Sequence, residues 1–390
     1  MSRHLEKAAA GALLEFMERR RDEALALVRE LVETESPSGD VEGSRAVVSL
    51  LAEAAHAAGS RLAVERIESP GYGEHLRVRA FTEGAGDSGT ILLVGHTDTV
   101  HPRGTLLARP WRSSGNRIYG PGIFDMKANC VMALEALRAC AELGLAPRRA
   151  VTLILTCDEE TGSMTGRALV EEEARRAHAA LVLEPPAAGG RVKTARKGTG
   201  IFRMEAQGIA AHAGLEPEKG ASATLELARQ IIRLSELDGR EKGTTINVGV
   251  IQGGTRSNVV AAEAHAEIDV RFSTSDEANR IKRELTEARP FDERVRLSVS
   301  GDINRPPLER TAQVAALFEQ ARQVAGAIGF ELGEAAVGGA SDGNFVAAMN
   351  VPVLDGLGIE GDGAHAEHEH IVVEDIARRG ALLAGLLASL

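Results

Sequence analysis

The stretch ILLVGHTDTV, Ile91–Val100, decides the fold of this chain. Its run of large aliphatic residues predicts a strand that is buried on both faces and ends at Gly95. His96 and Asp98 then lie at the carboxyl end of that strand, which is where open parallel sheets bind their ligands. One imidazole and one carboxylate are weak evidence by themselves. Their meaning depends on where the other acidic and histidine residues fall along the chain.

Two further buried strands are each followed by acidic residues. The apolar run Val151–Thr156 precedes three adjacent acids, Asp158–Glu160, and the run Ala180–Leu183 precedes Glu184. Adjacent like charges repel, and a bound cation would remove that cost; a solvated loop is the alternative. Three buried strands that end in acid or imidazole predict parallel strands alternating with helices.

A long loop follows the first strand and ends in YGPGIFDMKAN, Tyr119–Asn129. Loops of about 25 residues in a compact domain are usually functional or disordered. Asp125 lies just before a stretch with helical apolar periodicity, Lys127–Leu143. Its carboxylate could cap that helix, act as a ligand, or do both.

The order of elements predicts two domains, one of them inserted into the other. The 390 residues are too many for one ordinary core. Residues 195–305 read as strand, helix, strand, strand, helix, strand, the order of a ferredoxin-like α+β domain. Residues 1–194 and 306–390 together predict an α/β domain, with a mixed, mainly parallel sheet flanked by helices.

Composition excludes several classes of function. A net charge of −11 and a pI near 5.6 argue against nucleic acid or an acidic membrane surface as partner. The N-terminal segment has no apolar core of signal-peptide length, and no later run approaches the roughly 18 apolar residues of a membrane span. Cys130, Cys140 and Cys157 lack paired spacing, so we interpret them as buried free thiols in a reducing compartment. We expect a cytoplasmic protein.

The candidate ligands are imidazoles and carboxylates without thiolates. They are His96, Asp125, Glu159, Glu160, Glu184 and a histidine of GAHAEHEH. Such ligands suit zinc, cobalt or manganese better than a sulfur-based structural site. The set exceeds what one four-coordinate ion needs, so two ions bridged by a carboxylate fit better, and two-metal sites catalyse hydrolysis.

At this point the motifs resemble, in order, those of the M20 metallopeptidases. They are GHTDTV, GPGIFDMKAN, TCDEETGS, LEP, GIAAHAG, NVVAAEAHAEIDVR, GGASDGN and AHAEHEH. The resemblance covers nearly the whole chain, and RKG, AHAG and GGASDGN are most similar to the glutamate carboxypeptidase branch, that of carboxypeptidase G2. It implies a zinc exopeptidase type of fold with an inserted dimerisation domain, and two zinc ions per chain, with cobalt or manganese as alternatives.

The resemblance implies a role for each residue around the ions. His96 would bind one ion, and Asp98 would hold its imidazole through the other ring nitrogen. Asp125 would bridge the two ions. Glu160 would bind the second ion and Glu184 the first.

The resemblance also assigns the base and the last ligand. Glu159 would be the general base that takes a proton from the metal-bridging water and returns it to the leaving amine. His365, His368 and His370 compete for the remaining ligand position. The family's usual spacing, a histidine followed four residues later by a glutamate, selects His365 with Glu369.

In the inserted domain the resemblance implies a dimer contact and substrate-binding residues. His212 in AAHAG would stabilise the tetrahedral oxyanion in the partner's active site; a small-residue turn around a core histidine is the alternative. Asn258 and Arg271 match polar positions that contact substrate. Arg305 would bind the substrate's C-terminal carboxylate as a bidentate fork, although either arginine could instead be a structural ion-pair partner.

We therefore predict a dinuclear zinc amide hydrolase that releases a C-terminal amino acid, acidic by preference, from a peptide or N-acyl conjugate. Gly338 and Gly339 would let the backbone approach this small-molecule substrate. The alternative is an N-acyl-amino-acid deacylase, similar to acetylornithine deacetylase or aminoacylase, with the same mechanism. A non-catalytic binding protein on the same scaffold would lack a base or a ligand, and here every position is filled. A protein with one metal or none would require the acidic clusters to be coincidental.

Overall fold

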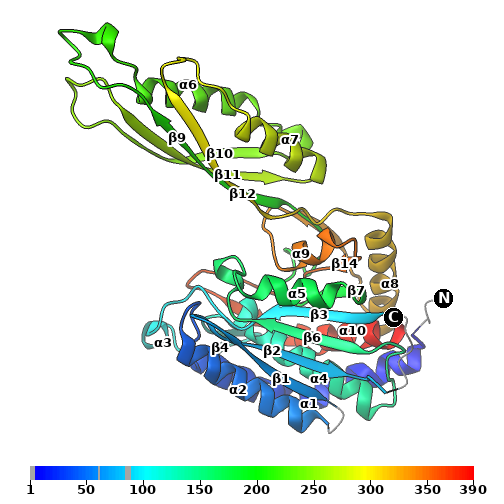
Figure 1. The fold of residues 1–390 in the computed structure, drawn as a ribbon. Helices are drawn as coiled ribbons and strands as arrows, with labels where there is room; N and C mark the ends of the chain where they lie inside the picture. The colour runs from blue at the N-terminus through cyan, green and yellow to red at the C-terminus, as the bar shows by residue number, and fades with distance from the viewer. Residues whose placement is uncertain (1–4, 60–61, 84–88) are drawn as a thin grey trace. The chain divides into compact units, whose positions relative to one another are not determined.

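The computed structural model describes residues 5–59, 62–83 and 89–390, and the chain divides into two compact units. The large unit comprises Met1–Thr194, Arg310–Val337 and Ser341–Leu390. The small unit comprises Ala195–Glu309 and Gly338–Ala340. Figure 1 follows the chain through both units by colour.

The large unit is built on a six-stranded sheet with the order β1-β2-β6-β3-β7-β14. Its strands are β1 Ala63–Ser69, β2 Gly73–Ala80, β3 Thr90–His96, β6 Val151–Thr156, β7 Ala177–Val182 and β14 Val353–Leu354. The pairs β3–β6, β3–β7 and β7–β14 are parallel, and β1 and β2 add an antiparallel edge. The predicted mixed, mainly parallel sheet is thereby confirmed. Ile91–Val94 are fully buried at its centre, as a strand covered on both faces requires.

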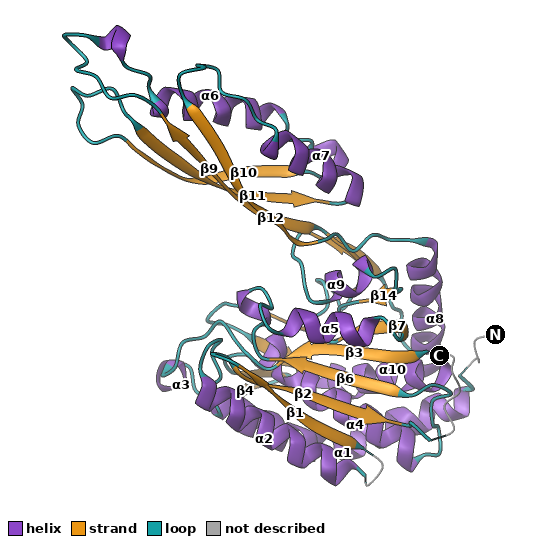
Figure 2. Cartoon of the chain, in the orientation of Figure 1, coloured by secondary structure: helices purple, strands orange, loops and turns teal. Residues whose placement is uncertain are grey.

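Helices cover both faces of this sheet. They are α1 Lys7–Glu33, α2 Val41–Ala58, α4 Ala128–Glu142, α5 Gly166–Ala174, α8 Ala312–Ile328, α9 Gly343–Ala348 and α10 Val373–Ser389, whereas the short α3, Thr105–Ala108, lies in the loop after β3. Helix α10 packs against α1, α4 and α8 on one side, whereas α5 packs against β3, β6, β7 and α9 on the other (Figure 2). In this three-layer arrangement the large apolar core lies on the α10 side of the sheet, where Ile91 and Leu93 point, while Leu92 and Val94 are buried on the other face.

The long loop after β3 contains more structure than its sequence indicates. It holds α3 and a hairpin, β4 Arg112–Ser114 with β5 Arg117–Tyr119. Strand β5 pairs with β16, His370–Val372, which in turn pairs with β15, Gly361–Asp362. A small second sheet therefore ties the end of the loop to the C-terminal histidine-rich segment. A further two-stranded sheet pairs β8, Val192–Arg196, with β13, Glu334–Val337.

The small unit has the ferredoxin-like order of elements. They are β9 Gly198–Gln207, α6 Ala223–Glu236, β10 Thr245–Gly253, β11 Glu263–Phe272, α7 Ser275–Thr286 and β12 Arg296–Arg305. The strands form one antiparallel sheet, β10-β11-β9-β12, and both helices pack on one face of it (Figure 1). Phe202, Met204 and Ala206 alternate along β9 into the core beneath the helices, while Ile201 is exposed.

The three cysteines are buried and free, as predicted. Burial raises the pKa of the Cys130 and Cys140 thiols to about 12, so neither is poised as a nucleophile. None of the described helices combines the length and apolar character needed to cross a lipid bilayer.

Candidate metal centre

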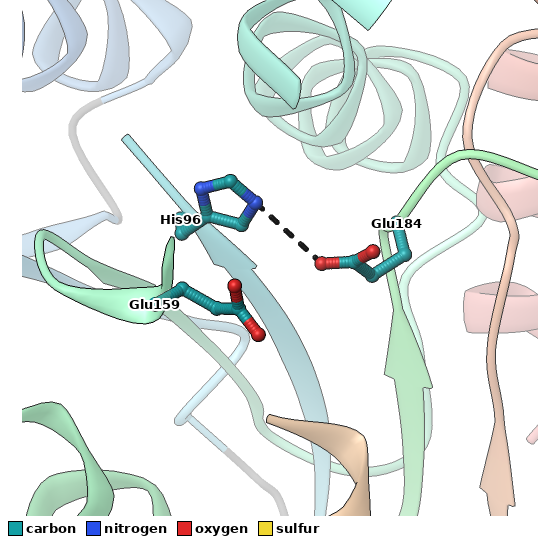
Figure 3. Close-up of side chains that lie close together, drawn as sticks. All are labelled: His96, Glu159 and Glu184. Atoms are coloured by element: carbon teal, nitrogen blue, oxygen red, sulfur yellow. Dashed lines mark ion pairs between the residues drawn. The ribbon is translucent and has the colours of Figure 1, made fainter. Parts of the chain in front are cut away.

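Three neighbouring strands deliver ionisable side chains to one edge of the central sheet. Strand β3 ends at His96, Glu159 begins the turn after β6, and Glu184 follows β7. Because β6, β3 and β7 are adjacent and parallel, their carboxyl ends coincide, and one ligand atom from each of these residues lies within 4.8 Å of the others. Figure 3 shows the three side chains converging, with His96 Nε2 3.5 Å from Glu184 Oε1.

Asp125 lies between two groups of candidate ligands. Its Oδ1 is 3.1 Å from His96 Nε2, and its Oδ2 is 3.4 Å from His365 Nε2. His365 Nε2 is also 3.1 Å from Glu160 Oε2. The carboxylate of Asp125 therefore faces His96 and Glu184 on one side and His365 and Glu160 on the other.

The alternative role of Asp125 as a helix cap is wrong. Helix α4 begins at Ala128, its N-cap residue is Lys127, and no side chain caps it. Asp125 instead belongs to the preceding turn, Ile123–Lys127, which reaches close to β3. Gly95 leaves room for the Met126 side chain, since a Cβ there would lie 2.5 Å from Met126 Cε.

The spacing of these atoms suits divalent ions. Ligand atoms around a tetrahedral zinc ion with bonds of about 2.0–2.1 Å lie about 3.3 Å apart. The four distances from Asp125, Glu160 and Glu184 to the two imidazoles run from 3.1 to 3.5 Å. Among the residues that the structure describes, Glu160 also has a buried Oε1 without a hydrogen-bond partner. Both observations fit a carboxylate and imidazole donor set built to hold cations.

Of the three competing histidines, only His365 reaches this cluster. His368 is exposed, with Nε2 3.8 Å from Asp362 Oδ2. His370 is buried against Tyr119 and directs Nδ1 to the His368 carbonyl at 2.9 Å. His365 has a backbone φ of +65°, a conformation that residues other than glycine rarely adopt, so its surroundings hold it in place.

The imidazoles and carboxylates of this cluster shift one another's pKa values. Hydrogen bonds to Asp125 and Glu160 raise the pKa of His365 to about 10. Burial by itself would lower the pKa of His96, but hydrogen bonds to Asp125, Asp98 and Glu184 raise it well above its usual value. Burial raises the pKa of Glu160. Metal ions at this site would have to displace the imidazole protons, which couples metal binding to pH.

The carboxylate of Asp98 contacts the turn of Glu159, the expected general base, more closely than it contacts the His96 ring. Its Oδ1 accepts from the Glu159 amide at 3.1 Å, and its Oδ2 accepts from the Glu160 amide at 3.2 Å. The nearest partner of His96 Nδ1 is the Asp98 carbonyl, at 3.0 Å, with the carboxylate 3.4 Å away. Ser38 also donates to Asp98, at 2.6 Å, although nothing in the sequence SPSG marks this serine as a partner of the cluster.

The expected substrate residues of the small unit lie at the two ends of its sheet. His212 and Asn258 are exposed on adjoining loops beyond the end of β9, where the Ala213 amide donates to the Asn258 carbonyl. The interpretation of His212 as a core histidine is therefore wrong. At the opposite end, Arg271 and Arg305 flank Thr199 on the two neighbouring strands.

The two arginines differ in burial. Arg271 forms a bidentate pair with Asp269 of its own strand, at 2.8 and 2.9 Å, so one carboxylate already occupies its fork. Arg305 is buried at the end of β12. Gly338 and Gly339 are exposed, and the Gly339 carbonyl accepts from Arg196 at 3.1 Å.

Comparison with known proteins identifies the family. The model of Peptidase family M20/M25/M40 matches residues 92–389. Carboxypeptidase G2 from Pseudomonas sp. (strain RS-16) is 29% identical over 380 residues, 95% of this chain and 90% of its own. Succinyl-diaminopimelate desuccinylase from Verminephrobacter eiseniae is also 29% identical, over 74% of this chain and 75% of its own.

Solved structures show the same fold. Aminopeptidase PepT from Bacillus cereus superposes with a TM-score of 0.78 at 23% identity, covering 95% of this chain and 98% of its own. Since the family model matches most of the chain and carboxypeptidase G2 matches nearly all of it, the protein belongs to peptidase family M20/M25/M40 and is a hydrolase that acts on amide bonds.

Proposed function

We propose that this hydrolase is a dinuclear zinc enzyme that releases a C-terminal amino acid from a peptide or an N-acyl conjugate. The family implies a divalent metal, typically zinc. The position of Asp125 carries the dinuclear part of the proposal, because its two oxygens face separate imidazoles at 3.1 and 3.4 Å. In this assignment His96 and Glu184 complete the first ion site. Glu160 and His365 complete the second.

Glu159 is the residue that we propose for proton transfer. It lies beside the cluster, and the contact between its amide and Asp98 fixes the turn that presents it. Ions bound at the centre would polarise the amide carbonyl and lower the pKa of water. The Glu159 carboxylate would accept a proton from that water and pass it to the leaving amine nitrogen.

Adjacent residues of one turn offer a matched test of these roles. Glu159→Gln is expected to keep two zinc ions per chain while kcat falls by about 10²–10⁴-fold, the usual contribution of a general base. Glu160→Gln, one residue away, is expected to keep only one ion. Elemental analysis of both variants, together with steady-state kinetics, shows which of the two residues binds metal and which transfers the proton. Loss of metal from Glu159→Gln would assign it a ligand role instead.

The substrate class rests on the relatives. Similarity to carboxypeptidase G2 spans nearly the whole of both chains, which favours cleavage next to a C-terminal amino acid. The desuccinylase reaches the same identity over a shorter span, which supports N-acyl-amino-acid deacylation as the second candidate. A panel of dipeptides and N-acyl amino acids ending in Glu, Asp, Ala or Phe separates the two. A preference set by the C-terminal residue supports carboxypeptidase activity. A preference set by the acyl group supports N-acyl-amino-acid deacylation.

We also propose that the enzyme works as a homodimer through the small unit. Strand β10 is an edge strand that exposes Val250 and Ile251, and α6, which packs against β10, exposes Leu225 and Ile232. An open strand edge beside exposed apolar side chains is suited to pairing with a second copy of the same surface.

The geometry of the small unit gives a second argument for two copies. Between Thr199, which Arg305 flanks, and the loop of His212 lies almost the whole length of β9, about 25–30 Å at strand rise. A dipeptide spans only about 7 Å. If His212 and Arg305 bind the same substrate, they come from different protomers.

The ring of His212 is suited to the oxyanion role. Its Nδ1 accepts from the Gly214 amide at 3.2 Å, so the ring proton lies on Nε2. An exposed Nε2–H is a donor that an oxyanion on a partner's substrate can use.

A further inference from the structure

The carboxylate of Glu369 accepts hydrogen bonds from four donors. Its Oε2 accepts from His101 Nε2 at 2.6 Å and from the Gly122 amide at 2.7 Å. Its Oε1 accepts from the amides of Phe124 and Asp125, at 2.9 and 3.0 Å. The side chain is only 2% exposed. A buried carboxylate is tolerated when its acceptor sites are filled in this way.

These hydrogen bonds join the two segments that carry the proposed ligands of the second ion. One segment is the turn that presents Asp125, and the other presents His365, four residues before Glu369. The turn is shaped to receive a carboxylate. Gly122 has φ +70°, and a Cβ there would lie 2.4 Å from Thr99 Cγ2, so glycine lets successive amides point at one anion.

His101 and Arg109 connect the same two segments a second time. Arginine can only donate, so Arg109 donates to His101 Nδ1 at 3.3 Å, and the His101 ring proton lies on Nε2, facing Glu369. The same guanidinium donates to the Ala366 carbonyl at 3.2 Å, next to His365 in the chain. The segment of His365 is thus held at Ala366 as well as at Glu369.

We infer that Glu369 is a positioning residue that sets the separation of Asp125 and His365 and thereby the affinity for the second metal ion. The inference rests on the proposed dinuclear centre. Glu369 faces the backbone of the turn, so it touches no reacting atom. A small displacement of either segment would open the distance of 3.4 Å between Asp125 Oδ2 and His365 Nε2. Partners that orient metal ligands are typically worth about 10–100-fold in metal affinity.

The test is zinc titration of metal-free protein against a chelator of known affinity. Glu369→Gln preserves size, but its amide nitrogen would face donors where an oxygen now accepts. We expect the second ion to bind about 10–100-fold more weakly while the first is retained. Glu226→Gln is the matched control. Glu226, in the small unit, is 1% exposed and accepts from the amides of Phe291 and Asp292, far from any proposed ligand in sequence.

The outcomes separate the inference from the proposed function. If the unsubstituted protein binds fewer than two ions, the dinuclear centre itself is wrong. If it binds two, and folded Glu369→Gln binds both with unchanged affinity, or Glu226→Gln weakens the second ion equally, only the role of Glu369 is overturned. Should Glu369→Gln fail to fold, His101→Leu decides, because it removes one donor to Glu369 and is expected to weaken binding of the second ion selectively. Unchanged binding by that variant would then refute the inference.

Discussion

The ionisable residues of the large unit and those of the small unit are held in different ways. In the large unit, Asp125 lies within 3.4 Å of two imidazoles that come from distant parts of the chain. In the small unit, His212 is exposed on a loop, and Arg271 is paired with a carboxylate of its own strand. A centre within one unit is fixed by that unit's packing. Residues such as His212, which are exposed in the small unit, can act only when a substrate or another protomer contacts them.

The strongest test of this contrast is complementation between inactive chains. Removing an oxyanion donor costs about 10²–10³-fold in kcat, so His212→Ala homodimers should be nearly inactive, as should Glu159→Gln homodimers. A mixed dimer contains one complete site if His212 acts across the interface. An equal, randomised mixture should therefore recover about a quarter of the unsubstituted activity. Confirmed subunit exchange without recovery would place His212 in its own protomer's site or outside any site.

A second test asks whether Arg305 binds the substrate's carboxylate. The unsubstituted enzyme should prefer a peptide acid over the corresponding C-terminal amide by about 10–100-fold in kcat/KM, the value of a hydrogen bond to a charged group. Arg305→Gln should remove that preference without changing zinc content. Arg271→Gln is the matched variant, and it should retain the preference because Asp269 already occupies that guanidinium. A preference that survives Arg305→Gln would make Arg305 a structural residue.

The candidate metal centre of the large unit should bind zinc with an affinity that depends on pH. The carboxylates beside His365 raise its pKa to about 10, so at neutral pH the ring carries a proton that zinc must displace. Apparent affinity should rise by about tenfold per pH unit for each displaced proton, up to about pH 10. Calorimetry in buffers of different ionisation enthalpy measures the protons released. His365→Ala should release about one proton fewer, and equal release would exclude His365 as a ligand.

The smallest predicted effect is on stability, and it concerns a charged residue of the small unit that is not a proposed metal ligand. Hydrogen bonds from Arg280 and Thr244 lower the pKa of Glu277 to about 2. A carboxyl group whose pKa is lower in the folded than in the unfolded protein stabilises the fold at pH values above its unfolded-state pKa. This contribution is lost as the pH falls toward 2. Glu277→Gln should cost about 1–2 kcal/mol of unfolding free energy at pH 7 and almost nothing near pH 2.

Urea unfolding at several pH values measures this contribution. Glu284→Gln, which alters an exposed pair with Arg233 at 3.5 Å, should cost less than about 0.5 kcal/mol. Zinc content should be unchanged in both variants. A loss of metal from Glu277→Gln would mean that the small unit supports the centre more directly than its contacts indicate.

Several features of the fold and of the cluster were predictable because they follow from local patterns. Continuous apolar runs predict β3, β6 and β7, and because parallel strands share a carboxyl edge, the sequence also predicts that His96, Glu159 and Glu184 lie close together. The position of Asp125 followed only from the resemblance, since its local sequence equally favoured a helix cap. The roles of these residues remain predictions until the metal is measured.

Other features were beyond sequence reasoning for physical reasons. His101 and Glu369 are 268 positions apart, and in AHAEHEH a buried glutamate looks the same as a solvated one. Strands β4 and β5 have three residues each, too few to show a period, so the sequence does not predict them. The carboxylate of Asp98 supports the turn of Glu159 through backbone amides, which leave no trace in residue identity.

The central place of β3 restricts how this protein can tolerate insertions and deletions. His96 pairs with Thr156 on β6, and Val94 pairs with Val182 on β7, so the strand is locked on both edges. Side chains alternate between the faces of a strand, and one added residue would turn the imidazole toward the opposite face. Length changes in related sequences should therefore accumulate in the β1–β2 hairpin and the surface turns, and be absent from Ile91–His96.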